Sequence, residues 1–356
     1  MSDALTISSH KGPYTVRFHD DALAALNADP PASAHFIVDR RVAELYAAEM
    51  DHVLAARSVL LVEATEEAKS LDRFPAYVDH LVGRRVRRGD VLVAIGGGII
   101  QDITCFLAAT LLRGIDWRFY PTTLLAQSDS CIGSKSSINA GAAKNILGTF
   151  TPPREVHVST RFLDTLDDRD MRSGIGEILK VHAIAGADAF DRIAGDYDAL
   201  LRSREKLLGY VRTALEVKKR YIEEDEFDRG VRNVFNYGHS FGHALESATK
   251  FAMPHGIAVT MGMDMANYTA CHLTNAPAAF FERMHPTLSA NYRGFEEQPV
   301  PPDAFYSALA KDKKNVGADL TLIQPDADGI IAKRTQPLDD GFREVCADYL
   351  QRVRRS

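Results

Sequence analysis

The chain has 356 residues, 46% of them hydrophobic and 25% charged, which is the composition of an ordinary globular protein large enough for two domains. Its net charge of −6 excludes the overall basic field of a protein that holds nucleic acid or an anionic membrane surface. The first residues are polar, no run is long and apolar enough to cross a bilayer, and the four cysteines are scattered. We therefore expect a cytoplasmic protein that binds neither nucleic acid nor membrane.

Short apolar runs alternate with helix-length segments through the first half of the chain. Strands are predicted at residues 35–39, 59–63, 90–95 and 155–159. Helices are predicted at residues 42–54, 68–81 and 103–112. This alternation is typical of a parallel sheet covered by helices on both faces, so we predict a Rossmann-like α/β domain over residues 1–168.

The strand signal fades after about residue 170, and the remaining periodicity is helical. Helices are predicted at residues 172–185, 204–223, 231–250 and 257–274, and a proline-rich connection at 291–303. We therefore predict an all-α domain over residues 169–356.

Three glycines, Gly96, Gly97 and Gly98, directly follow the predicted strand at 90–95, and Asp102 comes just before the helix at 103–112. Glycines at such a turn let backbone amides approach a pyrophosphate, and the helix N-terminus adds a positive dipole. The spacing is not G-x-G-x-x-G, so a tight strand-to-helix turn without a ligand is the alternative.

The segment that follows is rich in polar side chains among small residues. Asp129 and Lys135 are followed by Lys144 and Asn145, and this mixture suits a polyhydroxy phosphate ligand, with lysine as the point charge for phosphate. Taken alone, the segment could equally be a solvated loop. The later residues Lys218, Asp228 and Arg232, also taken alone, indicate a solvated helix face.

Three histidines, His239, His243 and His255, fall within one short region. The first two stand four residues apart, so on a helix both imidazoles project from one face. Upstream, Glu177 and Lys180 place two charges three residues apart in an apolar helix, where unpaired charge is costly. Glu177 and two of the histidines would complete the three-ligand set of a catalytic zinc. A core helix with polar ends and two hydrogen-bonded histidines is the alternative.

The order of these motifs resembles that of the 3-dehydroquinate synthase family, the sugar phosphate cyclases. The resemblance covers about residues 39–314 and rests on the segments G-G-G-x-x-x-D, R-G, P-T-T-L-L-A, D-S-x-I-G-x-K, K-N, G-x-x-E-x-x-K, R-N-x-x-N-x-G-H-S-x-G-H and H-G. It implies an N-terminal dinucleotide-binding α/β domain, a helical metal domain, and a homodimer. The implied cofactors are NAD and Zn²⁺, with Co²⁺ as a substitute.

The resemblance also implies roles for single residues. The implied metal ligands are Glu177, His239 and His255, which leaves His243 to contact substrate. The implied substrate residues are Asp129, Lys135, Asn145, Lys180, Lys218, Arg232, Asn236 and His243, with Lys313 or Lys314 as a late lysine and Arg113 reaching the phosphate site of a neighbouring subunit. The implied NAD-binding residues are Asp39, Glu66, Lys69, Gly96, Gly97, Gly98, Asp102, Thr122, Thr123, Lys144, Thr165 and Asp170.

The sequence departs from the family pattern at several positions. The lysine loop reads G-S-K-S-S-I-N where G-G-K-T is usual, and Asp228 and Ile257 each stand where a glutamate is usual. The segment at Glu66–Lys69 lacks the preceding glycine. The metal and phosphate residues are intact, so cyclase chemistry is supported while the identity of the ketose phosphate is left open.

The favoured reaction converts 3-deoxy-arabino-heptulosonate 7-phosphate to 3-dehydroquinate with loss of phosphate. A cyclase of specialised or polysaccharide metabolism that uses sedoheptulose 7-phosphate or a related phosphate is the main alternative, and the loop departures favour it. A metal-dependent polyol dehydrogenase would share the glycine turn and the histidines, but it has no need for Lys135, Asn145 and Arg232. A non-catalytic NAD-binding scaffold is the last alternative.

Overall fold

The computed structural model describes residues 4–141, 143–312, 315 and 319–356. They form two compact units: unit 1 runs to Asp167 and includes Lys218–Phe227, and unit 2 comprises Asp168–Val217 and Asp228–Ser356. The boundary between residues 168 and 169 stays a prediction. Segment 218–227, however, belongs to unit 1 and not to the helical domain, because Lys218 pairs with Asp129 (Nζ to Oδ1, 3.0 Å) and Glu226 accepts hydrogen bonds from the N-terminal loop.

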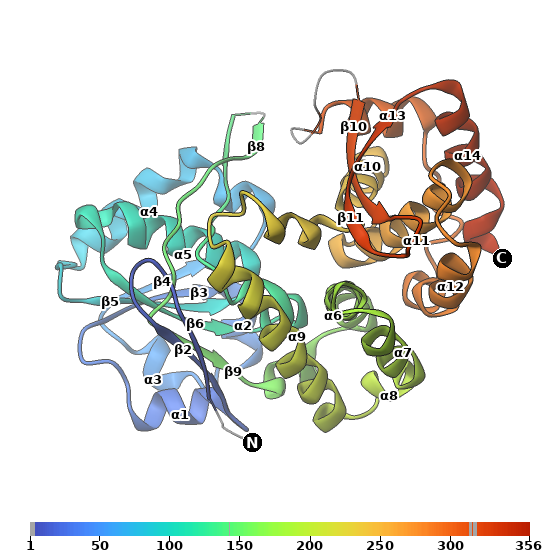
Figure 1. The fold of residues 1–356 in the computed structure, drawn as a ribbon. Coiled ribbons are helices and arrows are strands. Elements are labelled where there is room, and N and C mark those ends of the chain that lie inside the picture. Colours follow the sequence, from blue (N-terminus) through green and yellow to red (C-terminus); the bar gives the residue numbers. More distant parts are fainter. Residues whose placement is uncertain (1–3, 142, 313–314, 316–318) are drawn as a thin grey trace. The chain divides into compact units, whose positions relative to one another are not determined.

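A seven-stranded sheet forms the centre of unit 1, in the order β1-β2-β9-β6-β5-β3-β4 (Figure 1). β1 and β2 pair antiparallel and the other neighbours pair parallel. The strands are β1 (Ala4–Ile7), β2 (Tyr14–Phe18), β3 (Ala34–Asp39), β4 (Val59–Val62), β5 (Val91–Gly96), β6 (Asp116–Pro121) and β9 (Glu155–Val158). The four strands predicted from the sequence are β3, β4, β5 and β9. The mostly parallel sheet confirms the predicted α/β class, although β1, β2 and β6 were not foreseen.

Helices cover both faces of this sheet. They are α1 (Ala22–Ala28), α2 (Arg40–Leu45), α3 (Asp51–Leu54), α4 (Phe74–Gly83) and α5 (Gly98–Thr110). Phe36 and Val38 of β3 share one core cluster with side chains of α1 to α3. The intervening residue, Ile37, points to the opposite face, because successive strand residues alternate between faces. α5 packs against β3, β5 and β6, and β7 (Ile138–Ala140) and β8 (Ala143–Leu147) form a separate two-stranded sheet.

The helix predicted at residues 42–54 is wrong as a single element. The chain leaves helical geometry after Leu45 and resumes it at Asp51. Two tertiary hydrogen bonds hold the turn between them: Tyr46 Oη donates to the carbonyl oxygen of Arg161 (3.0 Å), and Asn27 Nδ2 donates to that of Glu49 (2.8 Å). These partners lie far away in the sequence, so local periodicity could not reveal the break.

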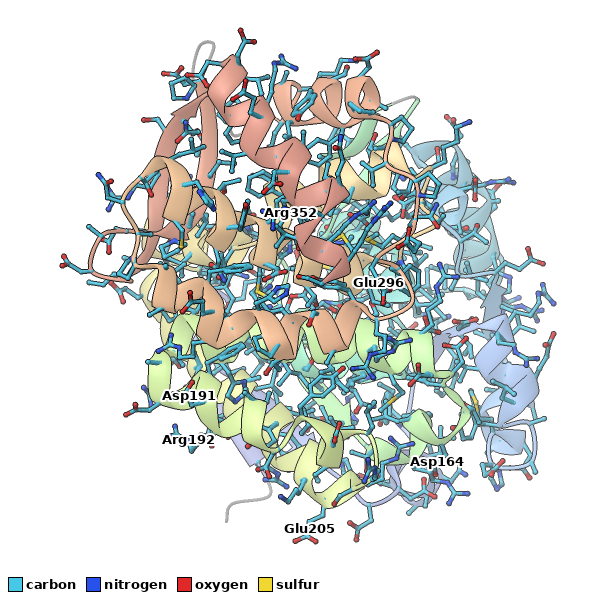
Figure 2. All side chains as sticks on the ribbon, turned by 90° about the vertical axis from the view of Figure 1, so that its right-hand side faces the viewer. Asp164, Asp191, Arg192, Glu205, Glu296 and Arg352 are labelled. Atoms are coloured by element: carbon cyan, nitrogen blue, oxygen red, sulfur yellow. The ribbon has the colours of Figure 1, made fainter. Side chains whose placement is uncertain are left out.

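Unit 2 is largely helical, as predicted. Its helices are α6 (Asp168–Ala185), α7 (Ala187–Gly195), α8 (Tyr197–Leu200), α9 (Arg204–Glu224, which continues into unit 1), α10 (His239–Ala248), α11 (His255–Leu273), α12 (Ala278–Tyr292), α13 (Pro302–Ala310) and α14 (Asp340–Gln351). Charged residues such as Asp191 of α7 and Glu205 of α9 lie exposed on the surface (Figure 2). None of the helices in the described residues is long and apolar enough to cross a membrane.

The expectation of an all-α second domain needs one correction. β10 (Asp319–Pro325) and β11 (Ile331–Pro337) form an antiparallel hairpin in unit 2. Its turn contains Asp328 and Gly329, and Gly329 has a φ of +75°. An Asp-Gly pair between two strand-like runs is a hairpin signal that the sequence analysis did not use.

A buried carboxylate ties three helices of unit 2 together. Asp264 of α11 is fully buried, and its Oδ2 atom accepts hydrogen bonds from His285 Nδ1 of α12 (2.8 Å), Tyr292 Oη of α12 (2.9 Å) and Tyr349 Oη of α14 (2.8 Å). Burial alone would lower the pKa of His285, but the hydrogen bond and charge of Asp264 raise it. The imidazolium form of His285 therefore stabilises the fold.

We expect the stability of the protein to fall as the pH rises through the pKa of folded His285. Because this pKa is raised above its ordinary value of 6.5, the contribution of His285 is complete below pH 6.5 and is lost at higher pH. Urea unfolding measured at several pH values gives the free energy of unfolding of each protein. As the pH rises above 6.5, this free energy should fall less in the His285→Gln variant than in the unmodified protein. Identical slopes in the two proteins would contradict the assignment.

Candidate active site

Glycines bring three helices of unit 2 into close contact. A Cβ atom at Gly176 of α6 would lie 2.2 Å from the carbonyl oxygen of Gly256 at the start of α11. Gly238, directly before α10, has a φ of +76°, and a Cβ there would lie 2.5 Å from the carbonyl oxygen of Val259. Only glycine fits at such distances. The glycines thus place the first residues of α10 and α11 beside the middle of α6.

Gly238 also divides the helix predicted at residues 231–250. A short 3₁₀ helix, Val231–Asn236, precedes the glycine and α10 follows it. The left-handed conformation of Gly238 ends helical hydrogen bonding at that point. As a result α10 begins at His239, just as α11 begins at His255 after the extended residue Pro254.

Glu177 stands at the centre of this contact. Its side chain is 2% exposed, and its Oε2 atom is ion-paired with the buried ammonium of Lys180 one turn later on α6. Burial by itself would raise the pKa of Glu177, but the ammonium of Lys180 holds it well below the ordinary range. The ion pair satisfies the expectation that two charges in an apolar helix must be compensated. The Oε1 atom is buried and accepts no hydrogen bond from the described residues.

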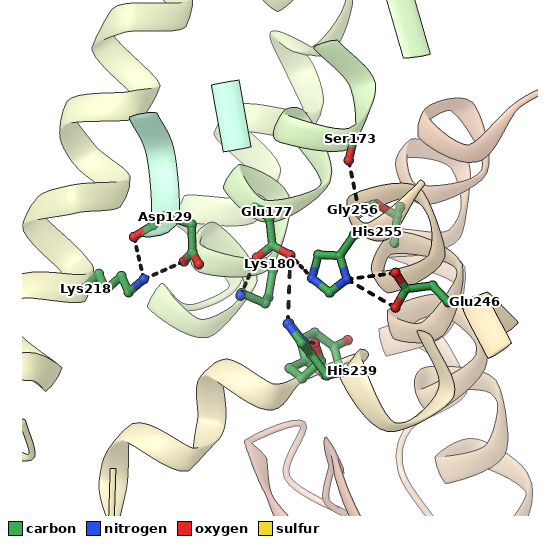
Figure 3. Close-up of polar contacts among 11 residues, drawn as sticks. Asp129, Ser173, Glu177, Lys180, Lys218, His239, Glu246, His255 and Gly256 are labelled. Atoms are coloured by element: carbon green, nitrogen blue, oxygen red, sulfur yellow. Dashed lines mark hydrogen bonds and ion pairs between the residues drawn. The ribbon is translucent and has the colours of Figure 1, made fainter. Parts of the chain in front are cut away.

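The two histidines that begin α10 and α11 present the same ring nitrogen to Glu177 (Figure 3). His239 Nε2 lies 3.9 Å from Glu177 Oε1, and His255 Nε2 lies 3.4 Å from it. The opposite nitrogens are engaged: His239 Nδ1 lies 3.1 Å from the carbonyl oxygen of Tyr237, and His255 Nδ1 lies 3.2 Å from Glu246 Oε2. Both acceptors need an N–H donor, so in the neutral tautomers the Nε2 lone pairs point toward Glu177 Oε1.

A third imidazole completes the cluster. His243 is exposed, and its ring centroid lies 5.3 Å from that of His239 and 5.7 Å from that of His255. Ligand atoms of the three histidines all lie within 4.8 Å of one another. With the buried oxygen of Glu177 this donor set fits a zinc ion, which takes imidazole nitrogen and carboxylate oxygen. The geometry allows His243 or Glu177 as the third ligand, and the choice of Glu177 stays a prediction.

In unit 1 the implied NAD-binding residues gather at the carboxyl ends of the parallel strands. Asp39 ends β3, Gly96 ends β5, and Thr122 directly follows β6. After β3 the chain crosses to β4 on one side, whereas β5 and β6 lie on the other, so Asp39 and Gly96 flank the point where the strand order reverses. Ligands of open α/β sheets bind at such a point.

The glycine turn itself suits a phosphate. No side chain among the described residues caps the N-terminus of α5, so its first amides are available. A Cβ atom at Gly98 would meet nothing within 4 Å, whereas one at Gly97 would lie 3.0 Å from Thr123 Cγ2. The open space in front of Gly98 fits a pyrophosphate better than it fits a merely structural turn.

A polar network joins implied NAD residues to an implied substrate residue. Lys69 Nζ is buried and donates to Asp102 Oδ2 (3.1 Å) and to Asn145 Oδ1 (2.9 Å). Burial raises the pKa of Asp102 to about 6, against the opposing effect of Lys69. Asn139 closes the network, because its Nδ2 donates to Glu66 Oε1 (2.9 Å) and its Oδ1 accepts from the backbone N–H of Asn145 (2.8 Å).

The remaining implied residues lie as follows. Lys135 and Lys144 are exposed, Asp129 is ion-paired with Lys218, and Thr165 Oγ1 lies 3.2 Å from Tyr46 Oη, all in unit 1. In unit 2, Asp170 lies in the first turn of α6, and Arg232 and Asn236 lie in the 3₁₀ helix Val231–Asn236. Arg113 lies in an exposed turn of unit 1 with a φ of +68°. Lys313 and Lys314 lie outside the described residues.

Sequence reasoning missed two residues of these networks. Glu246 orients His255, and Asn139 links Glu66 to Asn145. Glu246 stands three residues after His243 on α10, and this helical spacing was the available signal. Asn139 offered no local signal, because one of its partners, Glu66, lies in the helical turn after β4 and the other, Asn145, lies in strand β8.

Comparison with known proteins identifies the family. The model of the 3-dehydroquinate synthase N-terminal region matches residues 59–173, and that of the C-terminal region matches residues 174–315. A 3-dehydroquinate synthase of Enterococcus faecalis (strain ATCC 47077 / OG1RF) is 33% identical over 302 residues, which cover 82% of this chain and 83% of the relative. This chain belongs to the 3-dehydroquinate synthase family.

Solved structures of two synthases share the fold. 2-Deoxy-scyllo-inosose synthase, complexed with carbaglucose-6-phosphate, NAD⁺ and Co²⁺, matches with a TM-score of 0.83 at 23% identity, over 96% of this chain and 99% of that one. ValA, the 2-epi-5-epi-valiolone synthase of Streptomyces hygroscopicus subsp. jinggangensis 5008, with NAD⁺ and Zn²⁺ bound, matches with a TM-score of 0.81 at 27% identity, over 96% and 97%. As a 3-dehydroquinate synthase family member the chain is a phosphate-eliminating cyclase, so the polyol dehydrogenase and scaffold alternatives are discarded.

The predicted ligand set separates the histidines of the cluster. We expect one zinc per chain in the unmodified protein, its loss in the His255→Ala variant, and its retention in the matched His243→Ala variant, because His243 lies outside the set. Zinc content after dialysis against micromolar free metal measures this. If His243→Ala loses zinc while His255→Ala retains it, then His243 is a zinc ligand and His255 is not.

Proposed function

We propose that this chain is a NAD- and zinc-dependent cyclase that converts 3-deoxy-arabino-heptulosonate 7-phosphate to 3-dehydroquinate with loss of phosphate. We further propose that it acts in the cytoplasm as a homodimer. The observation that carries the proposal is the convergence of two oriented Nε2 atoms on the buried oxygen of Glu177 in a member of this family. The relative of 33% identity, itself a 3-dehydroquinate synthase, supports the choice of substrate.

Two cofactors would supply the chemistry that side chains cannot. Zinc, held by Glu177, His239 and His255, would act as a Lewis acid on a substrate oxygen. NAD⁺, held at the glycine turn of Gly96–Gly98 and at Asp39, would accept a hydride and return it within one turnover. The donor set and the uncapped N-terminus of α5 support these two sites.

The side chains of this chain would bind and orient the substrate. Lys135 carries an exposed ammonium, which suits phosphate as a point charge. Lys180 keeps Glu177 ionised and therefore able to bind a cation. His243 is exposed beside the two metal-binding imidazoles, where its ring can accept or deliver a proton. The exposed side chain of Arg113 would reach the phosphate site of a second copy, which is the reason to propose a homodimer.

The charge of the substrate decides between the two candidate reactions. A heptulosonate has a carboxylate at C1 in addition to its phosphate, and each buried anion needs a cationic partner. Two of the implied substrate residues, Lys218 and Arg232, are candidate partners for the carboxylate, but the ammonium of Lys218 is already ion-paired with Asp129. Arg232, which is 6% exposed, is the other implied cation, and we assign the carboxylate to it. Sedoheptulose 7-phosphate, which has a neutral C1 group, is therefore the second candidate.

NAD⁺ should be required for activity without being consumed. Because hydride is taken and returned within a turnover, the absorbance of reduced cofactor should stay flat while phosphate accumulates. Phosphate release and absorbance at the NADH band, followed in one reaction, measure this, and a reaction without added NAD⁺ after exhaustive dialysis serves as the control. A rise in NADH that equals the substrate consumed would contradict a cyclase.

Arg232→Lys should lower kcat/KM for the heptulosonate at least about tenfold, a loss of roughly 1.4 kcal/mol, because an ammonium cannot grip a carboxylate bidentately. Arg229→Lys, three residues away on an exposed side chain, should leave kcat/KM unchanged. Assays with each heptulose phosphate settle the substrate. If the unmodified enzyme has the higher kcat/KM for sedoheptulose 7-phosphate, the dehydroquinate assignment fails and the second candidate stands.

A further inference from the structure

A cavity lined by arginines lies in unit 1, at the opposite end of the sheet from the glycine turn. It has a volume of about 590 Å³ and opens at the amino ends of three strands: His35 is the second residue of β3, Ser58 precedes β4 and Asp90 precedes β5. The six residues of β5 separate Asp90 from the glycine turn, a length of roughly 20 Å. The cavity is therefore distinct from the predicted NAD site, and its volume suits a small organic molecule.

The cavity is strongly basic in a protein of net charge −6. Among the described residues that line it, four arginines (Arg57, Arg84, Arg85 and Arg87) face a single carboxylate, that of Asp90. All four arginines are exposed, and none forms an ion pair with another described residue. Guanidinium groups gathered without partners repel one another, so an anion that enters the cavity gains from all of them.

The carboxylate of Asp90 does not neutralise these arginines, because its own contacts hold it in place. Its Oδ2 atom accepts a hydrogen bond from the backbone N–H of Arg87 (2.7 Å) and lies 3.1 Å from His35 Nε2. His35, which is 5% exposed, is fixed in turn by Ser58 Oγ, 2.7 Å from its Nδ1. Asp90 thereby fixes the turn that presents Arg87, and the guanidinium groups are left for a ligand.

We propose that this cavity binds a small phosphorylated metabolite. Arginine has the planar fork of donors that matches phosphate oxygens, and several forks around one cavity suit a ligand with two or more negative charges. Pro30, Pro31 and Ala56 also line the cavity and offer apolar surface to the carbon part of a phosphate ester. An alternative role for Arg84 and Arg85, which follow the last turn of α4, is a favourable interaction with the negative end of the helix dipole. That role does not explain Arg57 and Arg87.

Binding of two probes to the full-length chain tests the proposal. Inorganic pyrophosphate and glucose 6-phosphate are titrated calorimetrically into a Lys135→Ala background saturated with NAD⁺. The substitution removes the exposed lysine proposed for the catalytic phosphate, and NAD⁺ occupies the glycine turn proposed for its pyrophosphate. We expect one site per chain, and at least a tenfold rise in Kd when Arg84→Ala and Arg87→Ala are combined. Arg88→Ala is the matched control, because this neighbouring exposed arginine does not line the cavity. It should leave Kd unchanged.

The probe that binds more tightly tells whether the cavity prefers free or esterified phosphate. Undetectable binding of both probes, or equal Kd values in the cavity variant and the Arg88→Ala control, would overturn the proposal. The cavity arginines are exposed and form no ion pair with another described residue. The double variant should therefore stay folded, and its melting temperature should fall only slightly through the lost interaction of Arg84 with the dipole of α4. The test uses no turnover, so its result is independent of the proposed cyclase reaction.

Discussion

The buried carboxylate of Glu177 is the constraint on which the candidate active site depends. An ionised side chain that is 2% exposed must be compensated, and removing a partner from such a pair typically costs about 3–5 kcal/mol. Lys180 compensates one oxygen, while the other faces two imidazoles and accepts no hydrogen bond from the part of the chain that the structure describes. A divalent cation would satisfy that second oxygen. The glycines at 176, 238 and 256 serve the same end, because larger residues would push α10 and α11 away from α6.

The two ends of the parallel strands in unit 1 carry two different kinds of candidate anion site. At the carboxyl ends of its strands, backbone amides at the start of α5 and the network around Lys69 and Asp102 suit a dinucleotide. At the amino ends, recognition would come from exposed arginine side chains around a cavity. The first arrangement is inherent in parallel β-α units, since each helix N-terminus follows a strand's carboxyl end. The second is a property of this chain's own residues, because nothing in the fold requires Arg57 or Arg87 at those positions.

Much of the secondary structure was predictable because it depends on local patterns. The strands β3, β4, β5 and β9 are compact apolar runs, and the long helices of unit 2 keep a 3.6-residue period. The errors lie where a distant partner decides. The turn after Leu45 is held by Arg161 and Asn27, and the break at Gly238 is required by the backbone of Val259. The hairpin β10–β11 was missed for a different reason, since its Asp-Gly turn was present in the sequence and not used.

The sequence by itself determined the family, the α/β and helical halves, and the residue types of the candidate site, because the order and spacing of motifs are written along the chain. Tertiary structure decided how those residues are used. It shows that Lys218 is paired with Asp129 and that Glu246 and Tyr237 fix the imidazoles of His255 and His239. It also brings Arg57 beside the arginines of segment 84–87 around one cavity. Such relations depend on distances between residues far apart in the sequence, and no local period or motif encodes those distances.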